Sequence, residues 1–173
     1  MRKSKYIKTV AALAAAALIC TGCSDKTVPT TSGTEQSTTL NSEETAKSIE
    51  EVYQEIEQTV SLKSPQCMDD DFISNYYGID AAALEEYVFS MSEDAAQAET
   101  VIIMKVKNTD DLEMLTNCLQ TVVDEKKNEM ENYIPEQFAI VEKSKVQTKD
   151  TYIWLVISDS ADAITDIIES GLF

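Results

Sequence analysis

The sequence predicts an α+β fold: a two-layer antiparallel sheet of about four strands with helices on one face, preceded by an N-terminal helix. Apolar side chains recur at helical spacing in some segments and alternate in others. After a helical lead-in, these segments follow the order strand, strand, helix, strand, strand, helix (ββαββα), which is typical of an antiparallel sheet packed against helices. About 130 residues suffice for one hydrophobic core, so we expect a single domain over 43–173.

The N-terminal helix is predicted from a capping pattern and from apolar spacing. Asn41-Ser42 precede Glu43-Glu44, as side-chain oxygens and acids do at the start of a helix. Apolar residues then recur at helical spacing between Ala46 and Val60. Ser64-Pro65 is expected to end this segment.

A short second helix is predicted over 72–77. Gly78 follows it and is expected to take the left-handed conformation that closes a helix. Asp69-Asp70-Asp71 lies near its start, where negative charge favours the positive end of the helix dipole. Because this run lacks the ligand spacing and central glycine of a calcium loop, we interpret it as a cap.

Two strands and a long helix come next. Tyr87, Phe89 and Met91 alternate along 85–91, as in a strand with one buried face. The strand over 101–107 is apolar on both sides, which predicts a central position with both faces partly covered. A helix from 108 to about 132 carries an apolar stripe and is stopped by Tyr133-Ile134-Pro135.

The C-terminal part predicts two more strands and a last helix. Residues 136–141 fit either a helical turn or a strand start, 144–148 is extended, and Lys149-Asp150 makes a tight turn. The strand over 152–158 is the most apolar in the chain, so we expect it to be central. The last helix is expected to begin at Ser158-Asp159-Ser160 and to end at Gly171. Its outer face carries an acidic row that we expect to be solvated: Asp159, Asp162, Asp166 and Glu169.

The first 22 residues are predicted to be a lipoprotein signal peptide. Four basic residues precede an apolar run over 9–19, which is too short for a bilayer core that needs about 20 residues. Thr21-Gly22 then precedes Cys23, whose thiol would receive a diacylglyceryl group. This run resembles the lipobox signals, although Cys20 stands where leucine is usual. The alternatives are an ordinary secretory signal and an uncleaved N-terminal helix.

The segment 23–42 is predicted to be a lipidated cysteine followed by a flexible linker. It is rich in threonine and serine and has almost no large apolar side chain, so it cannot bury a core. The localisation that follows is the extracytoplasmic side of the cell membrane. Two acyl chains on Cys23 would hold the chain stably on the bilayer.

Composition excludes several classes of function. Loss of the four basic residues before Cys23 would take the net charge from −17 to −21, which repels nucleic acid and anionic headgroups. The membrane is therefore expected as a partner only through the lipid anchor. The chain has no histidine, which removes Ser-His-Asp and Cys-His catalysis and histidine-ligated zinc. We expect no cofactor and no metal site.

Two cysteines remain beyond Cys23. Cys67 is expected in a loop and Cys118 beside a helix. They could pair in an oxidising compartment, but nothing in the sequence determines their distance, and a buried free thiol is the alternative for Cys118.

Several short segments together resemble the domain of unknown function 4358 family of clostridial-type lipoproteins. The resemblance covers about residues 70 to 160 and rests on the segments Tyr77-Gly78-Ile79-Asp80, Glu86-Tyr87-Val88, Lys105-Val106-Lys107, Tyr133-Ile134-Pro135-Glu136-Gln137 and Lys149-Asp150-Thr151-Tyr152. It implies a lipid-anchored extracytoplasmic domain and supplies no catalytic residue. The family often has a glycine in the turn where this chain has Lys149-Asp150, so a differently shaped hairpin is expected here.

The leading functional hypothesis is a non-catalytic binding or interaction module with a protein partner in the envelope. Tyrosines near strand ends would form its contact surface: Tyr76, Tyr77 and Tyr87. One alternative is a small envelope-acting enzyme that uses Glu85-Glu86 or Ser144-Lys145, although adjacent residues of a strand point to opposite faces. The other alternative is metal binding by the acidic surface.

Overall fold

A computed structural model describes residues 46–173. The chain divides into two units, 1–41 and 42–173, and every element below belongs to the second. The predicted signal peptide, Cys23, the linker and the Asn41-Ser42 cap lie outside the described residues.

The described part contains five α-helices, two short 3₁₀ helices and five strands. The α-helices are α1 (Ile49–Thr59), α2 (Asp70–Tyr77), α3 (Leu112–Met130), α4 (Pro135–Lys143) and α5 (Ala161–Leu172). The strands are β1 (Pro65–Cys67), β2 (Leu84–Ser92), β3 (Thr100–Val106), β4 (Val146–Lys149) and β5 (Tyr152–Ile157). The 3₁₀ helices are η1 (Ala81–Ala83) and η2 (Thr109–Asp111).

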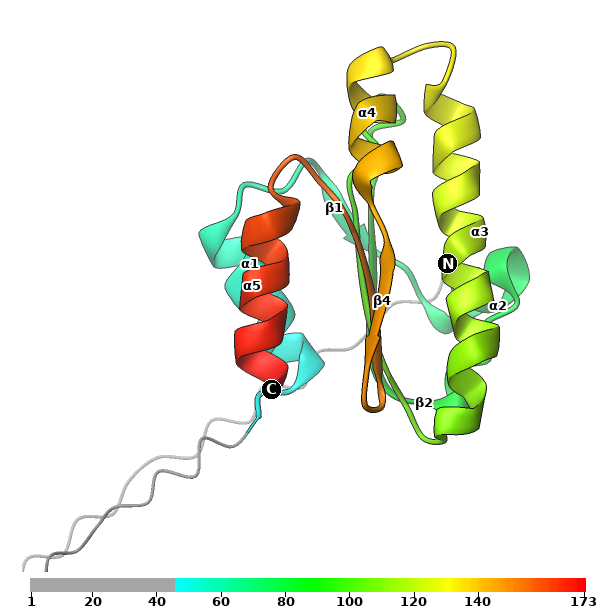
Figure 1. The fold of residues 1–173 in the computed structure, drawn as a ribbon, viewed down its shortest axis with the longest axis vertical. Coiled ribbons are helices and arrows are strands. Elements are labelled where there is room, and N and C mark those ends of the chain that lie inside the picture. Colours follow the sequence, from blue (N-terminus) through cyan, green and yellow to red (C-terminus); the bar gives the residue numbers. More distant parts are fainter. Residues whose placement is uncertain (1–45) are drawn as a thin grey trace, which may run out of the picture. The chain divides into compact units, whose positions relative to one another are not determined.

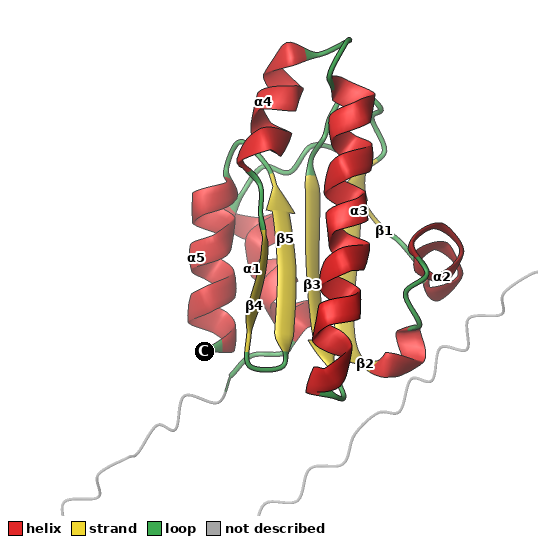
Figure 2. Cartoon of the chain, turned by 45° about the vertical axis from the view of Figure 1, so that its right-hand side comes forward, coloured by secondary structure: helices red, strands yellow, loops and turns green. Residues whose placement is uncertain are grey.

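The strands form one antiparallel sheet in the order β1-β2-β3-β5-β4 (Figure 2). The predicted α+β class and the antiparallel pairing are confirmed. The two strands predicted to be central, β3 and β5, are both interior. They pair directly from Thr100 opposite Ile157 to Lys105 opposite Tyr152.

Helices cover both faces of the sheet, so the predicted two-layer arrangement with helices on one face is wrong. Helices α1 and α5 pack on one face, and α2, α3 and α4 on the other (Figure 1). The reason is that the interior strands β3 and β5 carry large apolar residues at successive positions, so both of their faces are apolar. In β5, Ile153 and Leu155 belong to the core under α3, whereas Trp154 and Val156 belong to the core under α1 and α5.

The predicted number of about four strands is also wrong, because β1 is a fifth. Its three residues are all exposed, so it carries none of the apolar alternation by which the other strands are recognised. It is held by pairing with β2, with Pro65 opposite Ser92 and Cys67 opposite Ser90. The segment after α1 that contains Ser64-Pro65 therefore lines the edge of the sheet.

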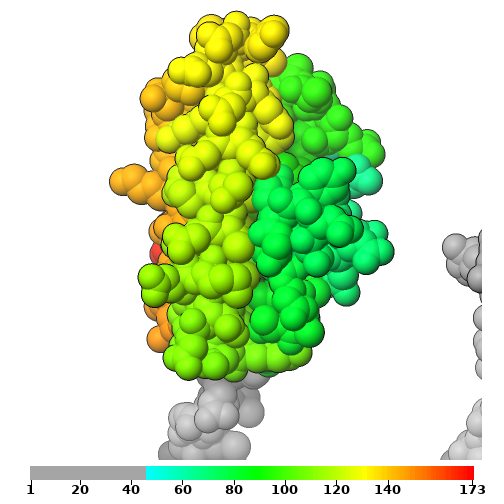
Figure 3. Space-filling model, turned by 90° about the vertical axis from the view of Figure 1, so that its right-hand side faces the viewer, coloured from blue at the N-terminus to red at the C-terminus, as the bar shows by residue number. Residues whose placement is uncertain are grey.

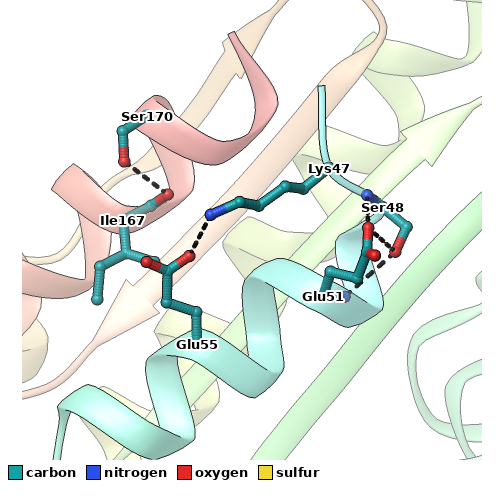
Figure 4. Close-up of polar contacts among 6 residues, drawn as sticks. All are labelled: Lys47, Ser48, Glu51, Glu55, Ile167 and Ser170. Carbon is teal, nitrogen blue, oxygen red and sulfur yellow. Dashed lines mark hydrogen bonds and ion pairs between the residues drawn. The ribbon is translucent and has the colours of Figure 1, made fainter. Parts of the chain in front are cut away.

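Helix α1 begins later than the sequence predicted. Ser48 is its N-cap and forms a capping box with Glu51: the Ser48 hydroxyl accepts from the Glu51 N–H, and the Glu51 carboxylate accepts from the Ser48 N–H (Figure 4). The hydrogen bonds from Ser48 lower the pKa of the Glu51 carboxyl. A carboxylate three residues after a serine is the sequence pattern of this motif, so Ser48 and Glu51 mark the start of α1 more specifically than Asn41-Ser42 and Glu43-Glu44 do.

Helix α5 passes through Gly171 instead of ending there, and it runs to Leu172. A Cβ at this position would lie 2.7 Å from Cγ2 of Val52, which is buried and β-branched. The glycine is therefore needed for the close approach of α5 to α1. The Gly171 carbonyl also accepts from the Lys47 N–H at 2.8 Å, and the Lys47 ammonium pairs with Glu55 at 2.7 Å (Figure 4).

The remaining elements agree with the predictions, and the structure decides the one stretch for which two alternatives were left open. Gly78 closes α2 with φ of 67°, and the Asp69 carboxylate caps its start by accepting from the Phe72 N–H. The ambiguous stretch 136–141 is helical and belongs to α4. In the β4–β5 hairpin, Asp150 takes the left-handed conformation with φ of 54°, which a glycine would adopt without steric cost.

Candidate functional site

The three tyrosines singled out in the sequence all lie on or beside α2. Tyr77 stacks on Phe89 of β2 with ring centroids 5.3 Å apart. Phe72 packs edge-on against the same ring at 6.4 Å and stacks on Tyr76 at 4.5 Å. Helix α2 is thus attached to the sheet through an aromatic cluster, and Tyr76 is its outermost member with 70% of its surface exposed.

Tyr87 has a structural contact of its own. Its hydroxyl donates to the Asp70 carboxylate in the first turn of α2. Burial, and secondly this carboxylate, raise the pKa of the Tyr87 phenol. Tyr87 therefore attaches the start of α2 to β2, whereas Tyr76 is free to contact another molecule. The structure brings the three tyrosines to one region in these different roles.

A groove beside α2 adds residues that the sequence analysis missed. It has a volume of about 490 Å³ and is lined by Tyr77, Asp110, Glu113, Met114, Asn117, Cys118 and Thr121. Met114 is 44% exposed, and its sulfur lies 4.0 Å from that of Cys118. Both residues lie off the buried stripe of α3, and an apolar residue off the stripe is the signal that points to this surface. Figure 3 shows this face, with α3 along its length and α2 beside it.

We call this surface, made by Phe72, Tyr76, Tyr77, Met114 and the rest of the groove lining, the α2–α3 surface. It carries negative charge. Asp110 and Glu113 line the groove, and no lysine is among the described residues that do. Burial, and then the carboxylates of Glu125 and Glu129, raise the pKa of the Tyr77 phenol. Apolar side chains and acids therefore adjoin one another here.

A second hollow, of about 610 Å³, lies between α4 and β4 on one side and α5 on the other. It contains Ser144 and Lys145, the pair considered for catalysis, together with Asp159 and Asp162. The Ser144 hydroxyl donates to the Val141 carbonyl at 2.7 Å, which satisfies the end of α4. A serine used in this way is a helix cap, so the hollow presents charges of both signs without a paired nucleophile and base.

The other residues considered for chemistry do not converge. Glu85 pairs with Lys105 at 3.0 Å and raises the pKa of that ammonium, whereas Glu86 accepts from the Ile49 N–H at 2.9 Å. Cys67 and Cys118 are both free thiols, so they do not form a disulfide. Burial raises the pKa of each. Within the described residues, no cluster of three or more acids or cysteines is arranged to hold a metal ion.

One buried carboxylate lies outside both hollows and was not anticipated. Glu99 is 7% exposed and stands just before β3. It accepts from the Ser158 hydroxyl at 2.7 Å and from the backbone N–H of Lys63. These contacts tie the segment after α1 to the end of β5, which is a structural role.

A comparison with models of known protein families identifies the family of this chain. The model of the domain of unknown function 4358 family matches residues 58–158 of the chain. The chain belongs to this family. The matched segment of this chain contains all five strands and helices α2, α3 and α4, whereas α5 and most of α1 lie outside it. The α2–α3 surface therefore lies within the family's common segment, and the resemblance noted from short sequence segments is confirmed.

No curated protein and no solved structure shows a significant match to the chain. Among residues 46–173, no helix has the length and apolar character needed to cross a bilayer.

Proposed function

We propose that this chain is a membrane-anchored extracytoplasmic lipoprotein whose folded unit is a non-catalytic binding module for an envelope protein. The observation that carries the binding role is the α2–α3 surface, where Tyr76 and Met114 are exposed beside a groove. Adjacent exposed apolar side chains on a folded domain are typical of a contact site. The anchor rests on the lipobox-like run that ends at Cys23.

The position at which the chain joins the folded unit supports this proposal. The backbone at Lys47 is hydrogen-bonded to Gly171 of α5. Figure 4 shows Ser48 with its capping partner Glu51 at the start of α1. Both helices cover the face of the sheet opposite to α2 and α3 (Figure 1). The described chain therefore begins on the face opposite to the α2–α3 surface. The strongly negative charge argues against nucleic acid as the partner.

Photo-cross-linking in intact cells tests the binding role. A photoreactive phenylalanine analogue at the position of Tyr76 is expected to give one discrete adduct with an envelope protein. The matched control places the same analogue at Tyr133, which is 84% exposed and lies beyond the end of α3. The same set of adducts from both positions, or none from Tyr76, would contradict a specific contact surface.

The anchor makes a separate prediction. Cys23→Ala removes the thiol that would receive the diacylglyceryl group, so we expect complete loss of label from a tagged fatty acid and release of the chain from the membrane fraction. Cys20→Ala is the matched control and should leave both unchanged, since Cys20 precedes the expected cleavage point. Persistent labelling of the Cys23→Ala chain would overturn the assignment.

A further inference from the structure

The groove of the α2–α3 surface runs along one side of η2 and α3, with Tyr77 of α2 beside them. The lining residues from η2 and α3 recur at steps of three or four: Asp110, Glu113, Met114, Asn117, Cys118 and Thr121. Such residues lie above one another on a helix. The eleven steps from Asp110 to Thr121, at about 1.5 Å each, give a length of about 16 Å. That length accommodates three turns of a helical peptide or about five residues of an extended one.

The groove combines apolar side chains with two acids at one end. Tyr77, Met114 and Cys118 supply the apolar contact area, and Met114 can adapt its shape to different side chains. Asp110 and Glu113 are the charged residues of its lining. Ion pairs of the described residues bring lysine to Glu55, Glu85 and Glu129 and to neither of these two acids. The Asp110 carboxylate accepts a hydrogen bond at 3.4 Å from the Asn108 amide, which is neutral, so neither acid is neutralised by a lysine in these ion pairs.

Charge decides between the possible occupants. The chain's own segment 24–45 contains four acids and one base, Lys26, so the groove would repel it. A second copy would bring the same large negative charge. A partner with lysine or arginine beside an apolar side chain satisfies both the floor and the acids.

We infer that the groove of the α2–α3 surface binds a basic amphipathic peptide segment of a partner protein. This inference rests on the proposed function and specifies the chemistry of the partner. An apolar side chain of the segment lies between Tyr77, Met114 and Cys118. A flanking lysine or arginine pairs with Asp110 and Glu113.

Fluorescence anisotropy of the full chain carrying Cys23→Ala with labelled 12-residue peptides tests the inference. The probe alternates leucine and lysine at helical spacing; one reference peptide replaces lysine by glutamate, and another replaces leucine by serine. We expect the Leu/Lys peptide to bind at least about tenfold more tightly than either reference, because only it offers both apolar and cationic groups.

Matched variants separate the groove from the overall charge. D110N/E113Q is expected to weaken binding of the Leu/Lys peptide about tenfold, whereas D166N/E169Q, the same charge change on the outer face of α5, should change it less than about twofold. Met114→Ser is likewise expected to weaken binding, and Tyr133→Ser, another exposed position, is not.

Equal losses in D110N/E113Q and D166N/E169Q would overturn the inference, because they would show attraction by net charge alone. The inference would also be overturned if the reference peptide with serine in place of leucine bound as tightly as the Leu/Lys peptide, or if the Leu/Lys peptide did not bind. These results leave the proposed function standing if the cross-link at Tyr76 persists. Loss of that cross-link as well would remove both.

Discussion

Replacement of Phe89 by alanine is expected to destabilise the folded unit by about 4 kcal/mol, within the range for a fully buried phenylalanine. Phe89 is 0% exposed and lies in β2 beneath α2. Its ring contacts both Tyr77 and Phe72, the two residues that attach α2 to the sheet. The truncation removes its own buried area and leaves a cavity under both partners, so its effect exceeds the simple transfer energy.

Unfolding by urea, followed through the fluorescence of Trp154, measures this loss. Trp154 is the one tryptophan of the chain, is 2% exposed, and lies on the opposite face of the sheet, so its signal reports global unfolding. Phe89→Leu should reduce the free energy of unfolding clearly less, and Tyr133→Ala, at an 84% exposed residue, less again. A loss below about 1 kcal/mol for Phe89→Ala would show that the aromatic cluster does not hold α2.

The same variant connects the core to the proposed binding role. Because α2 is a short helix attached through aromatic contacts, loosening Phe89 should increase proteolytic cleavage after Tyr76 and Tyr77 before global unfolding. The α2–α3 surface would then lose its α2 side. We therefore expect the cross-link at Tyr76 to be lost in Phe89→Ala even under conditions where Trp154 remains buried.

The sequence predicts the strands of the sheet better than the arrangement of the helices around it. Apolar residues alternate along β2 and form continuous runs along β3 and β5, so the positions of these strands and the central placement of β3 and β5 are predicted from residues alone. The same apolar residues on both sides of β3 and β5 indicate that both faces are covered. Which helix covers which face depends on contacts between distant segments, and local periodicity does not contain that information.

The features that escaped prediction depend on contacts with segments distant in the sequence. β1 consists of three exposed residues and exists through its pairing with β2. Gly171 follows the usual pattern of a helix end, but its role is to admit Val52 of a helix far away in the sequence. The residues of the groove were missed for a related reason: Met114 and Cys118 were not part of the predicted stripe, and only the position of Tyr77 beside them makes a surface.

Glu99 shows how a charged residue can be structural without any sequence pattern. It lies in the loop between β2 and β3, in a run with Glu93 and Asp94 that looks like a solvated turn. Yet Glu99 and its partner Ser158 are each 7% exposed. The adjacent Ala98 N–H donates to the Gln137 side chain at 2.9 Å, so α4 also holds this loop. A buried carboxylate is tolerated here because donors from two distant segments satisfy it.

Glu99→Ala is accordingly expected to lower the free energy of unfolding by about 3 kcal/mol. It removes two hydrogen bonds to the carboxylate and leaves the buried Ser158 hydroxyl and the Lys63 N–H without their acceptor. Glu99→Gln keeps an acceptor oxygen for one donor but turns an amide N–H₂ towards the other, so an intermediate loss is expected. The matched control is Glu93→Ala, at an exposed residue of the same loop, which should stay within about 0.5 kcal/mol. Urea unfolding of the three variants measures these differences, and equal stability of Glu99→Ala and Glu93→Ala would show that the buried carboxylate does not hold the segment after α1 to β5.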